Sequence, residues 1–148
     1  MPELISAATA LQDITHRAQE TGLAAIDTEF VWTSTYYPRI GLIQIAVSDT
    51  EMWLVDAPNL SDVNPLKQLL EDPHVVKILH DASGDLTILS RVCNTLPKNI
   101  FDMRLAAGFC GFPATLSLGN LAEELLGVHL PKTESRSDWL QRPLTPEQ

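Results

Sequence analysis

The segment Leu23-Ala-Ala-Ile-Asp-Thr-Glu-Phe30 contains the pattern that decides the fold. Four apolar residues follow Gly22, which predicts a short buried strand after a turn. Side chains alternate between the two faces of a strand, so Asp27 and Glu29 share one face. Two carboxylates at the end of an apolar strand are costly without a cation, and oxygen ligands suit Mg²⁺ or Mn²⁺. The alternative is a strand end that enters solvent with both acids hydrated, and the spacing alone does not choose between the two.

The chain of 148 residues is 45% hydrophobic, which predicts one domain over 1–148 with a core that needs no disulfides. Its two cysteines, Cys93 and Cys110, form no CxxC pair and are interpreted as thiols of a reducing compartment. We find no secretion signal and no membrane span of ~20 residues, which predicts a cytoplasmic protein that does not bind a membrane.

The net charge of −9 argues against a non-specific nucleic-acid coat, but it does not exclude a nuclease whose acids hold metal ions.

Apolar periodicity and turn residues predict an alternation of helices and strands. Helices are expected over 4–20, 59–71, 83–93, 103–111 and 117–126, and strands over 23–30, 39–48, 52–56, 75–79 and 100–102. The polar turn 49–51 predicts an antiparallel hairpin between its two flanking strands. Hairpin-linked strands followed by strand–helix alternation predict an α/β fold, a mixed sheet with helices on both faces.

A third carboxylate, Asp85, falls in the first turn of the expected helix 83–93, just after His80 and Asp81 at a strand end. An acid in a first turn is explained by the helix dipole, and Asp81 is explained as a cap. The sharper interpretation is that Asp85 joins Asp27 and Glu29 at the carboxyl ends of the strands, where open α/β sheets bind their ligands.

Several stretches together carry a family resemblance. Asp27-Thr-Glu-Phe30, Thr35-Tyr-Tyr-Pro-Arg39 and Gly41-Leu-Ile-Gln44 precede similar stretches in 80–86, 101–107 and 132–145. In this order they resemble the ribonuclease D family, in the tyrosine-containing branch of the DEDD superfamily of 3′→5′ exonucleases. The resemblance implies a ribonuclease-H-like (DnaQ-like exonuclease) mixed sheet and hydrolysis of RNA 3′ ends, tRNA precursors among them.

The resemblance also implies roles for single residues. Asp27, Glu29 and Asp85 correspond to catalytic acids that bind two divalent ions, Mg²⁺ or Mn²⁺, which activate water and neutralise the leaving oxygen. Contacts with the nucleic acid are implied for Thr28, Phe30, Arg39, His80, Lys132 and Arg136. Core packing explains Phe30 equally well, and His80 is better explained as a core histidine than as a catalytic one.

Basic and aromatic residues near these motifs have competing interpretations. Arg142 joins Arg39, Lys132 and Arg136 as an expected phosphate contact, although each could equally be a solvated surface charge. The three tryptophans are interpreted as packing residues rather than base platforms: Trp32, Trp53 and Trp139.

The family's third motif, a Tyr followed four residues later by a metal-binding Asp, has no counterpart after 144–148. We therefore expect an exonuclease domain that is truncated at its C-terminus, slow or no cleavage by these 148 residues, and a poorly anchored tail over 128–148. Two functions stay open: a metal-dependent 3′→5′ exoribonuclease, or an exonuclease fragment that binds nucleic acid or a partner without cleaving. The sequence does not indicate an oligomeric state.

Overall fold

A mixed six-stranded sheet with the order β1-β4-β3-β2-β5-β6 forms the centre of the computed structural model, which describes residues 4–33, 35–130, 137–146 and 148. The strands are β1 Leu4–Ile5, β2 Leu23–Val31, β3 Arg39–Ala46, β4 Met52–Val55, β5 Val76–Leu79 and β6 Ile100–Asp102. The helices are α1 Ala8–Thr21, the short 3₁₀ helix Ala57–Asn59, α2 Asn64–Glu71, α3 Ser83–Cys93, α4 Met103–Phe109 and α5 Leu118–Leu126. β3 is antiparallel to β2 and β4, and the other neighbours are parallel, which confirms the predicted α/β class.

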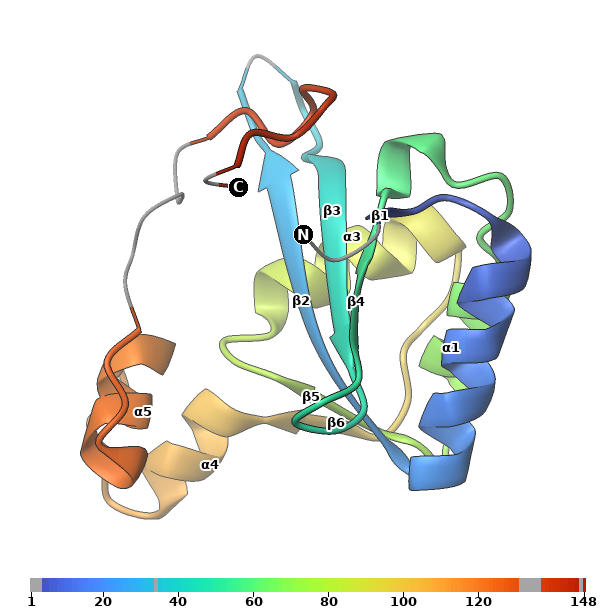
Figure 1. The fold of residues 1–148 in the computed structure, drawn as a ribbon. Coiled ribbons are helices and arrows are strands. Elements are labelled where there is room, and N and C mark those ends of the chain that lie inside the picture. Colours follow the sequence, from blue (N-terminus) through green and yellow to red (C-terminus); the bar gives the residue numbers. More distant parts are fainter. Residues whose placement is uncertain (1–3, 34, 131–136, 147) are drawn as a thin grey trace.

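One face of the sheet is buried under α1, α2 and α3, and this packing forms the hydrophobic core. Ile43 and Ile45 of β3 contribute to it, together with Val47 just after the strand, as the sequence predicts. The helices contribute Leu11, Ile14, Ala18, Leu66, Leu69, Leu70, Leu89 and Cys93. Helices α4 and α5 lie on the other side of the sheet from α1 (Figure 1). Among the described helices, none combines the length and the apolar character needed to cross a bilayer.

Two expected helices begin later than the sequence suggests. Residues 4 and 5 are not helical but pair with β4 as an edge strand, where the Asp56 amide donates to the Ile5 carbonyl oxygen at 2.7 Å. α2 begins at Asn64 rather than at residue 59. Pro65 explains this start, because proline has no amide hydrogen and is tolerated only in the first turn of a helix.

The C-terminal segment 137–146 is anchored, so the expectation of a loose tail is wrong for this part of the chain. Trp139 is only 5% exposed. Its backbone lies so close to Gly41 of β3 that a Cβ at residue 41 would come within 2.3 Å of the Trp139 carbonyl oxygen. A buried tryptophan and a close backbone approach thus hold a segment that has no helix of its own. Residues 131–136 of the expected tail lie outside the described residues.

Candidate active site

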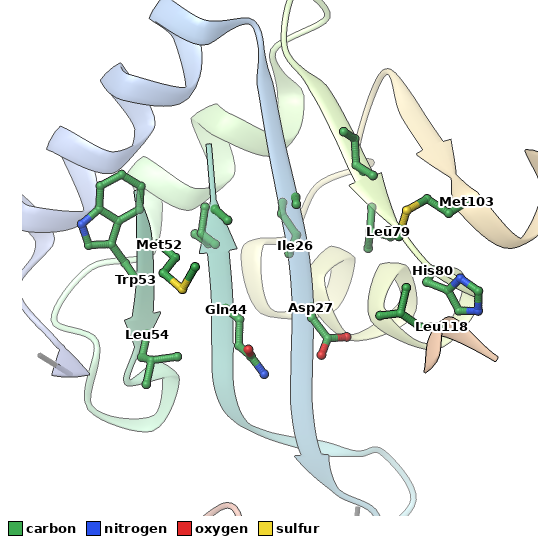
Figure 2. A pocket seen from close by; sticks show the side chains of 14 residues that line it. Ile26, Asp27, Gln44, Met52, Trp53, Leu54, Leu79, His80, Met103 and Leu118 are labelled. Atoms are coloured by element: carbon green, nitrogen blue, oxygen red, sulfur yellow. The ribbon is translucent and has the colours of Figure 1, made fainter. Parts of the chain in front are cut away.

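Strand β2 presents Asp27 and Glu29 on the face that α1–α3 leave uncovered. Its residues alternate in burial, with Ile26 and Thr28 buried toward the core and Asp27 accessible. Asp27 pairs with Gln44 of β3, and the register shifts directly after Glu29. This alternation confirms that the two acids share a face. Figure 2 shows the Asp27 carboxylate pointing from β2 toward the side where Leu118 and His80 lie.

Asp85 is tied to β2 through the residue between the two acids. Its Oδ1 accepts hydrogen bonds from the Thr28 amide at 3.1 Å and from the Thr28 hydroxyl at 2.5 Å. Asp85 lies in the first turn of α3, which packs against the buried side of the sheet. The Thr28 hydroxyl therefore holds Asp85 beside β2, and its contact with a nucleotide stays a prediction.

The three carboxylates repel one another in a partly desolvated setting. Burial and then the charge of Asp85 raise the pKa of Asp27. Burial, followed by the charges of Asp27 and Asp85, raises the pKa of Glu29 to about 7. Burial also raises the pKa of Asp85, against the opposing effect of the Thr28 hydrogen bond. Among the described carboxyl groups with a resolved shift, these three alone have raised pKa values, and a nearby cation would relieve this cost.

A hollow of about 320 Å³ opens on the same face, lined by Asp27 and Gln44 together with His80, Met103 and Leu118 (Figure 2). The His80 Nε2 lies 3.1 Å from the Leu116 carbonyl oxygen, while its buried Nδ1 has no hydrogen-bond partner among the described residues. His80 is thus half-buried in the wall of the hollow that contains Asp27, and its contact with substrate stays a prediction.

Asp102 positions the loop that leads into α3. Its carboxylate accepts hydrogen bonds from the amides of Asp81 at 3.1 Å and Ala82 at 2.9 Å, and it also caps the N-terminus of α4 through the Arg104 amide at 2.8 Å. Burial raises the pKa of Asp102, but these amide bonds outweigh burial and hold the pKa below its usual value. Its role is structural, since it sets the start of the helix that carries Asp85.

The basic residues expected to contact phosphate have different environments. Arg39 is exposed beside a hollow of about 420 Å³ between the β2–β3 loop and the C-terminal segment. Arg142 is not such a contact and not a solvated charge. Its Nη2 donates to Asp56 Oδ1 at 2.6 Å and to the Gly41 carbonyl oxygen at 2.7 Å. Lys132 and Arg136 lie outside the described residues.

The aromatic residues also differ from one another. Phe30 is half-buried, so packing and base contact both stay open for it. Trp139 is buried and Trp53 half-buried, as expected for packing residues, but Trp32 is 62% exposed and its interpretation as a packing residue is wrong. Trp32 lies in the loop just after β2, where the alternation of strand residues no longer indicates which side chains are buried.

Oxygen-only donors suit a hard divalent cation, and the three repelling carboxylates fit that chemistry. No group of three or more His, Cys, Asp or Glu side chains in the described part of the chain is already gathered around one metal position. Asp85 Oδ1 instead accepts hydrogen bonds from the Thr28 amide and hydroxyl. Asp27, Glu29 and Asp85 are the residues that could hold a metal ion here.

Comparison with known proteins extends this description. A family model described as 3′-5′ exonuclease matches residues 2–148. The chain belongs to the 3′-5′ exonuclease family. Within this exonuclease family, ribonuclease D from Desulfotalea psychrophila is 48% identical over 145 residues, which cover 98% of the chain. Ribonuclease D from Escherichia coli is 40% identical over 146 residues, which cover 99% of the chain. The chain spans 39% of the length of each of these two relatives.

Solved structures of the exonuclease family agree with the fold. The crystal structure of Escherichia coli RNase D, described as an exoribonuclease involved in structured RNA processing, matches with a TM-score of 0.93 and 40% identity and covers 100% of this chain and 39% of that one. Brucella melitensis NrnC bound to pGG matches with a TM-score of 0.76 and 26% identity, over 86% of this chain and 62% of that one. These matches are consistent with the ribonuclease-H-like fold expected from the sequence.

The sequence did not reveal how Asp85 reaches β2. A hydroxyl residue between two acids was the available signal, because a buried threonine needs a hydrogen-bond partner. The anchoring role of Arg142 had no local signal, since its partners Gly41 and Asp56 are 101 and 86 residues away.

Proposed function

We propose that this chain carries the catalytic acids of a cytoplasmic 3′→5′ exoribonuclease that shortens RNA from its 3′ end. The observation that supports it best is the pair of hydrogen bonds by which Thr28 holds Asp85 next to the strand of Asp27 and Glu29. Asp27 lines an accessible hollow, and burial together with the charge of Asp85 raises its pKa, so the proposed site combines carboxylates from two elements. Family membership and the similarity to proteins named ribonuclease D support RNA as the substrate.

Asp27, Glu29 and Asp85 would hold Mg²⁺ or Mn²⁺. When bound, such ions lower the pKa of the attacking water and neutralise charge on the leaving 3′-oxygen. Asp27 is assigned the central position, because it lies at the hollow and feels the charge of Asp85. Thr28 acts by holding Asp85. Phe30 and His80, together with Arg39, Lys132 and Arg136, are proposed to contact the terminal nucleotides and their phosphates.

The natural substrates are proposed to be structured RNAs such as tRNA precursors. The description of Escherichia coli RNase D as an exoribonuclease involved in structured RNA processing supports this proposal. The complex of Brucella melitensis NrnC with pGG supports a site that accepts the last nucleotides of a chain.

The test is the shortening of a 5′-labelled single-stranded RNA by the 148-residue chain in Mg²⁺ or Mn²⁺, read nucleotide by nucleotide on a gel. The sequence leads us to expect little or no shortening by this chain alone. In a longer form that supplies the family's third motif, we expect stepwise loss from a free 3′ end that EDTA stops and that Asp27→Asn abolishes. Asp27→Asn should leave the free energy of unfolding unchanged or higher in EDTA, because removing one of three crowded like charges relieves repulsion. Exposed Asp13→Asn is the matched control. Near-normal shortening by Asp27→Asn would remove this residue from the mechanism.

Binding of RNA ends without cleavage is the second candidate. The observation that favours it is that, within the described ranges, no three His, Cys, Asp or Glu side chains are gathered around one metal position. The expectation from the sequence that this chain cleaves slowly or not at all agrees with this candidate. RNA that is bound but never shortened in the gel assay would favour this candidate over the first.

A further inference from the structure

The loop that joins β2 to β3 exposes aromatic side chains that nothing in the candidate active site uses. Tyr36 is 85% exposed, Tyr37 is 45% exposed and Trp32 is 62% exposed. Exposing adjacent aromatic rings to water is unfavourable. Exposed patches of aromatic side chains therefore typically mark binding surfaces.

The two tyrosines are arranged with an arginine from another element. Their ring centroids lie 4.7 Å apart with an interplanar angle of 84°, an edge-to-face contact. The guanidinium carbon of Arg91, on α3, lies 3.5 Å from the centroid of the Tyr37 ring. The Thr35 hydroxyl donates to the Tyr37 carbonyl oxygen at 2.7 Å, which fixes the loop locally. We call Tyr36, Tyr37 and Arg91 the aromatic platform.

The aromatic platform is built on the two elements that carry the catalytic acids. The loop continues directly from β2, whose strand residues end at Val31. Arg91 lies less than two turns beyond Asp85 on α3, about 9 Å along the helix axis. That distance corresponds to two or three stacked nucleotides at about 3.4 Å each. A strand with its 3′ end at the acids would therefore reach the platform with the nucleotides that precede the end.

We propose that the aromatic platform binds unpaired bases a few nucleotides upstream of the RNA 3′ end, a role that rests on the proposed exoribonuclease function. Tyr36 offers a ring on which a base stacks, and stacking tolerates any base sequence. Tyr37 holds Arg91 by a cation–π contact, and the guanidinium donates to a phosphate. Among the described residues, no carboxylate forms an ion pair with Arg91, so its charge is available.

The charge of the chain gives stacking particular weight. A net charge of −9 disfavours the general attraction to phosphates on which most RNA-binding surfaces rely. Binding through aromatic rings and one or two arginines should then depend weakly on salt, since the slope of log affinity against log salt scales with the number of neutralised phosphates.

The experiment measures fluorescence anisotropy of labelled single-stranded RNA, a dinucleotide and an octanucleotide, with the 148-residue chain in EDTA so that no cleavage occurs. Tyr36→Ala should weaken octanucleotide binding by about 5- to 150-fold, the range for stacking of one base on one aromatic ring. Tyr36→Phe, which keeps the ring, should bind as the wild type does. Dinucleotide binding should be the same for all three, because a dinucleotide does not reach the platform. Phe109→Ala, which removes a 93% exposed aromatic ring from α4, is the matched control.

The outcomes separate this proposal from the function on which it rests. Equal octanucleotide affinity for wild type and Tyr36→Ala would overturn the platform. So would a Tyr36→Ala effect on dinucleotide affinity as large as its effect on octanucleotide affinity. Failure of the wild type to bind the octanucleotide would overturn it as well. The exoribonuclease proposal is judged separately by the gel assay with Asp27→Asn. Binding through Tyr36 without any shortening of RNA would contradict catalysis and leave the aromatic platform in place.

Discussion

At the scale of single residues, Thr28 connects the sequence pattern to the site. It sits between two acids on β2, is 6% exposed, and donates both its amide and its hydroxyl to Asp85. A carboxylate that accepts two hydrogen bonds from one residue is fixed in place without a cation. Thr28 therefore holds Asp85 beside β2, where burial and the charge of Asp85 raise the pKa values of Asp27 and Glu29.

Thr28→Val should destabilise the protein by about 1.5–3 kcal/mol, because the hydroxyl bond to a charged and partly buried carboxylate is lost while the shape is kept. Urea unfolding at pH 7 in EDTA measures this, and Mn²⁺ calorimetry should show weaker binding to the variant. Thr33→Val, at an exposed threonine of the neighbouring loop, is the control. A variant as stable as the wild type would mean that the added methyl packing offsets the lost bond and that Thr28 is not needed to hold Asp85.

At the scale of elements, Asp102 joins three of them. It ends β6, caps α4 and receives the amides of Asp81 and Ala82 from the loop before α3. Asp81 adopts a positive φ of 59°, a left-handed conformation that is unfavourable for most residues and is held here by the Asp102 bond and an ion pair with Arg104. The position of Asp85 thus depends on a residue 17 positions further along the chain.

Asp102→Ala should cost about 2–4 kcal/mol of unfolding free energy at pH 7, because a helix cap and two loop amides lose their acceptor. The pKa of Asp102 is lowered in the folded state, so its contribution is present above the unfolded pKa and is lost as the pH falls through the folded one. The difference in unfolding free energy between wild type and Asp102→Asn should therefore shrink below about pH 4. Denaturant unfolding from pH 3 to 7 tests this, and a difference that stays constant would argue against an ionised Asp102.

At the scale of the whole molecule, the C-terminal segment is joined to residues 86 and 101 positions earlier in the chain. Arg142 bonds Asp56 after β4 and the Gly41 carbonyl of β3, and its Nη1 donates to the Trp139 carbonyl oxygen at 3.0 Å. Burial raises the pKa of Asp56, but the bonds from Arg142 and Asn59 outweigh it, and the net shift is downward. Segment 137–146 is therefore part of the folded domain.

Arg142→Met should release this segment and cost about 2–4 kcal/mol, because Asp56 stays buried without its cation. Gly41→Ala should have a similar effect on the segment, since its Cβ would lie 2.3 Å from the Trp139 carbonyl oxygen. Limited chymotrypsin digestion should cleave after Trp139 faster in both variants than in the wild type. Lys98→Met, at an exposed cation of the loop before β6, is the control. Unchanged cleavage in both variants would contradict the anchoring role.

Local sequence was sufficient to predict the features that depend on neighbouring residues. The alternation around Asp27 placed two acids on one face, and residues 83–93 were predicted as α3 at its observed bounds. Gly127 ends α5 in a left-handed conformation with φ 66°, as a glycine after the predicted helix 117–126 indicates. These signals lie within one turn or one strand, where spacing alone specifies the geometry.

Contacts between residues far apart in the chain, in contrast, follow from tertiary packing alone. Leu4 and Ile5 form a strand because β4 offers an edge, and a segment of two residues has no periodicity to detect. Thr28 reaches Asp85 across 57 residues, and Arg142 reaches Gly41 across 101. Such pairs form because the packing of the whole sheet and its helices brings them within hydrogen-bond distance, and neither residue's local sequence specifies its partner. The anchoring of the C-terminal segment and the attachment of Asp85 to β2 follow from that packing.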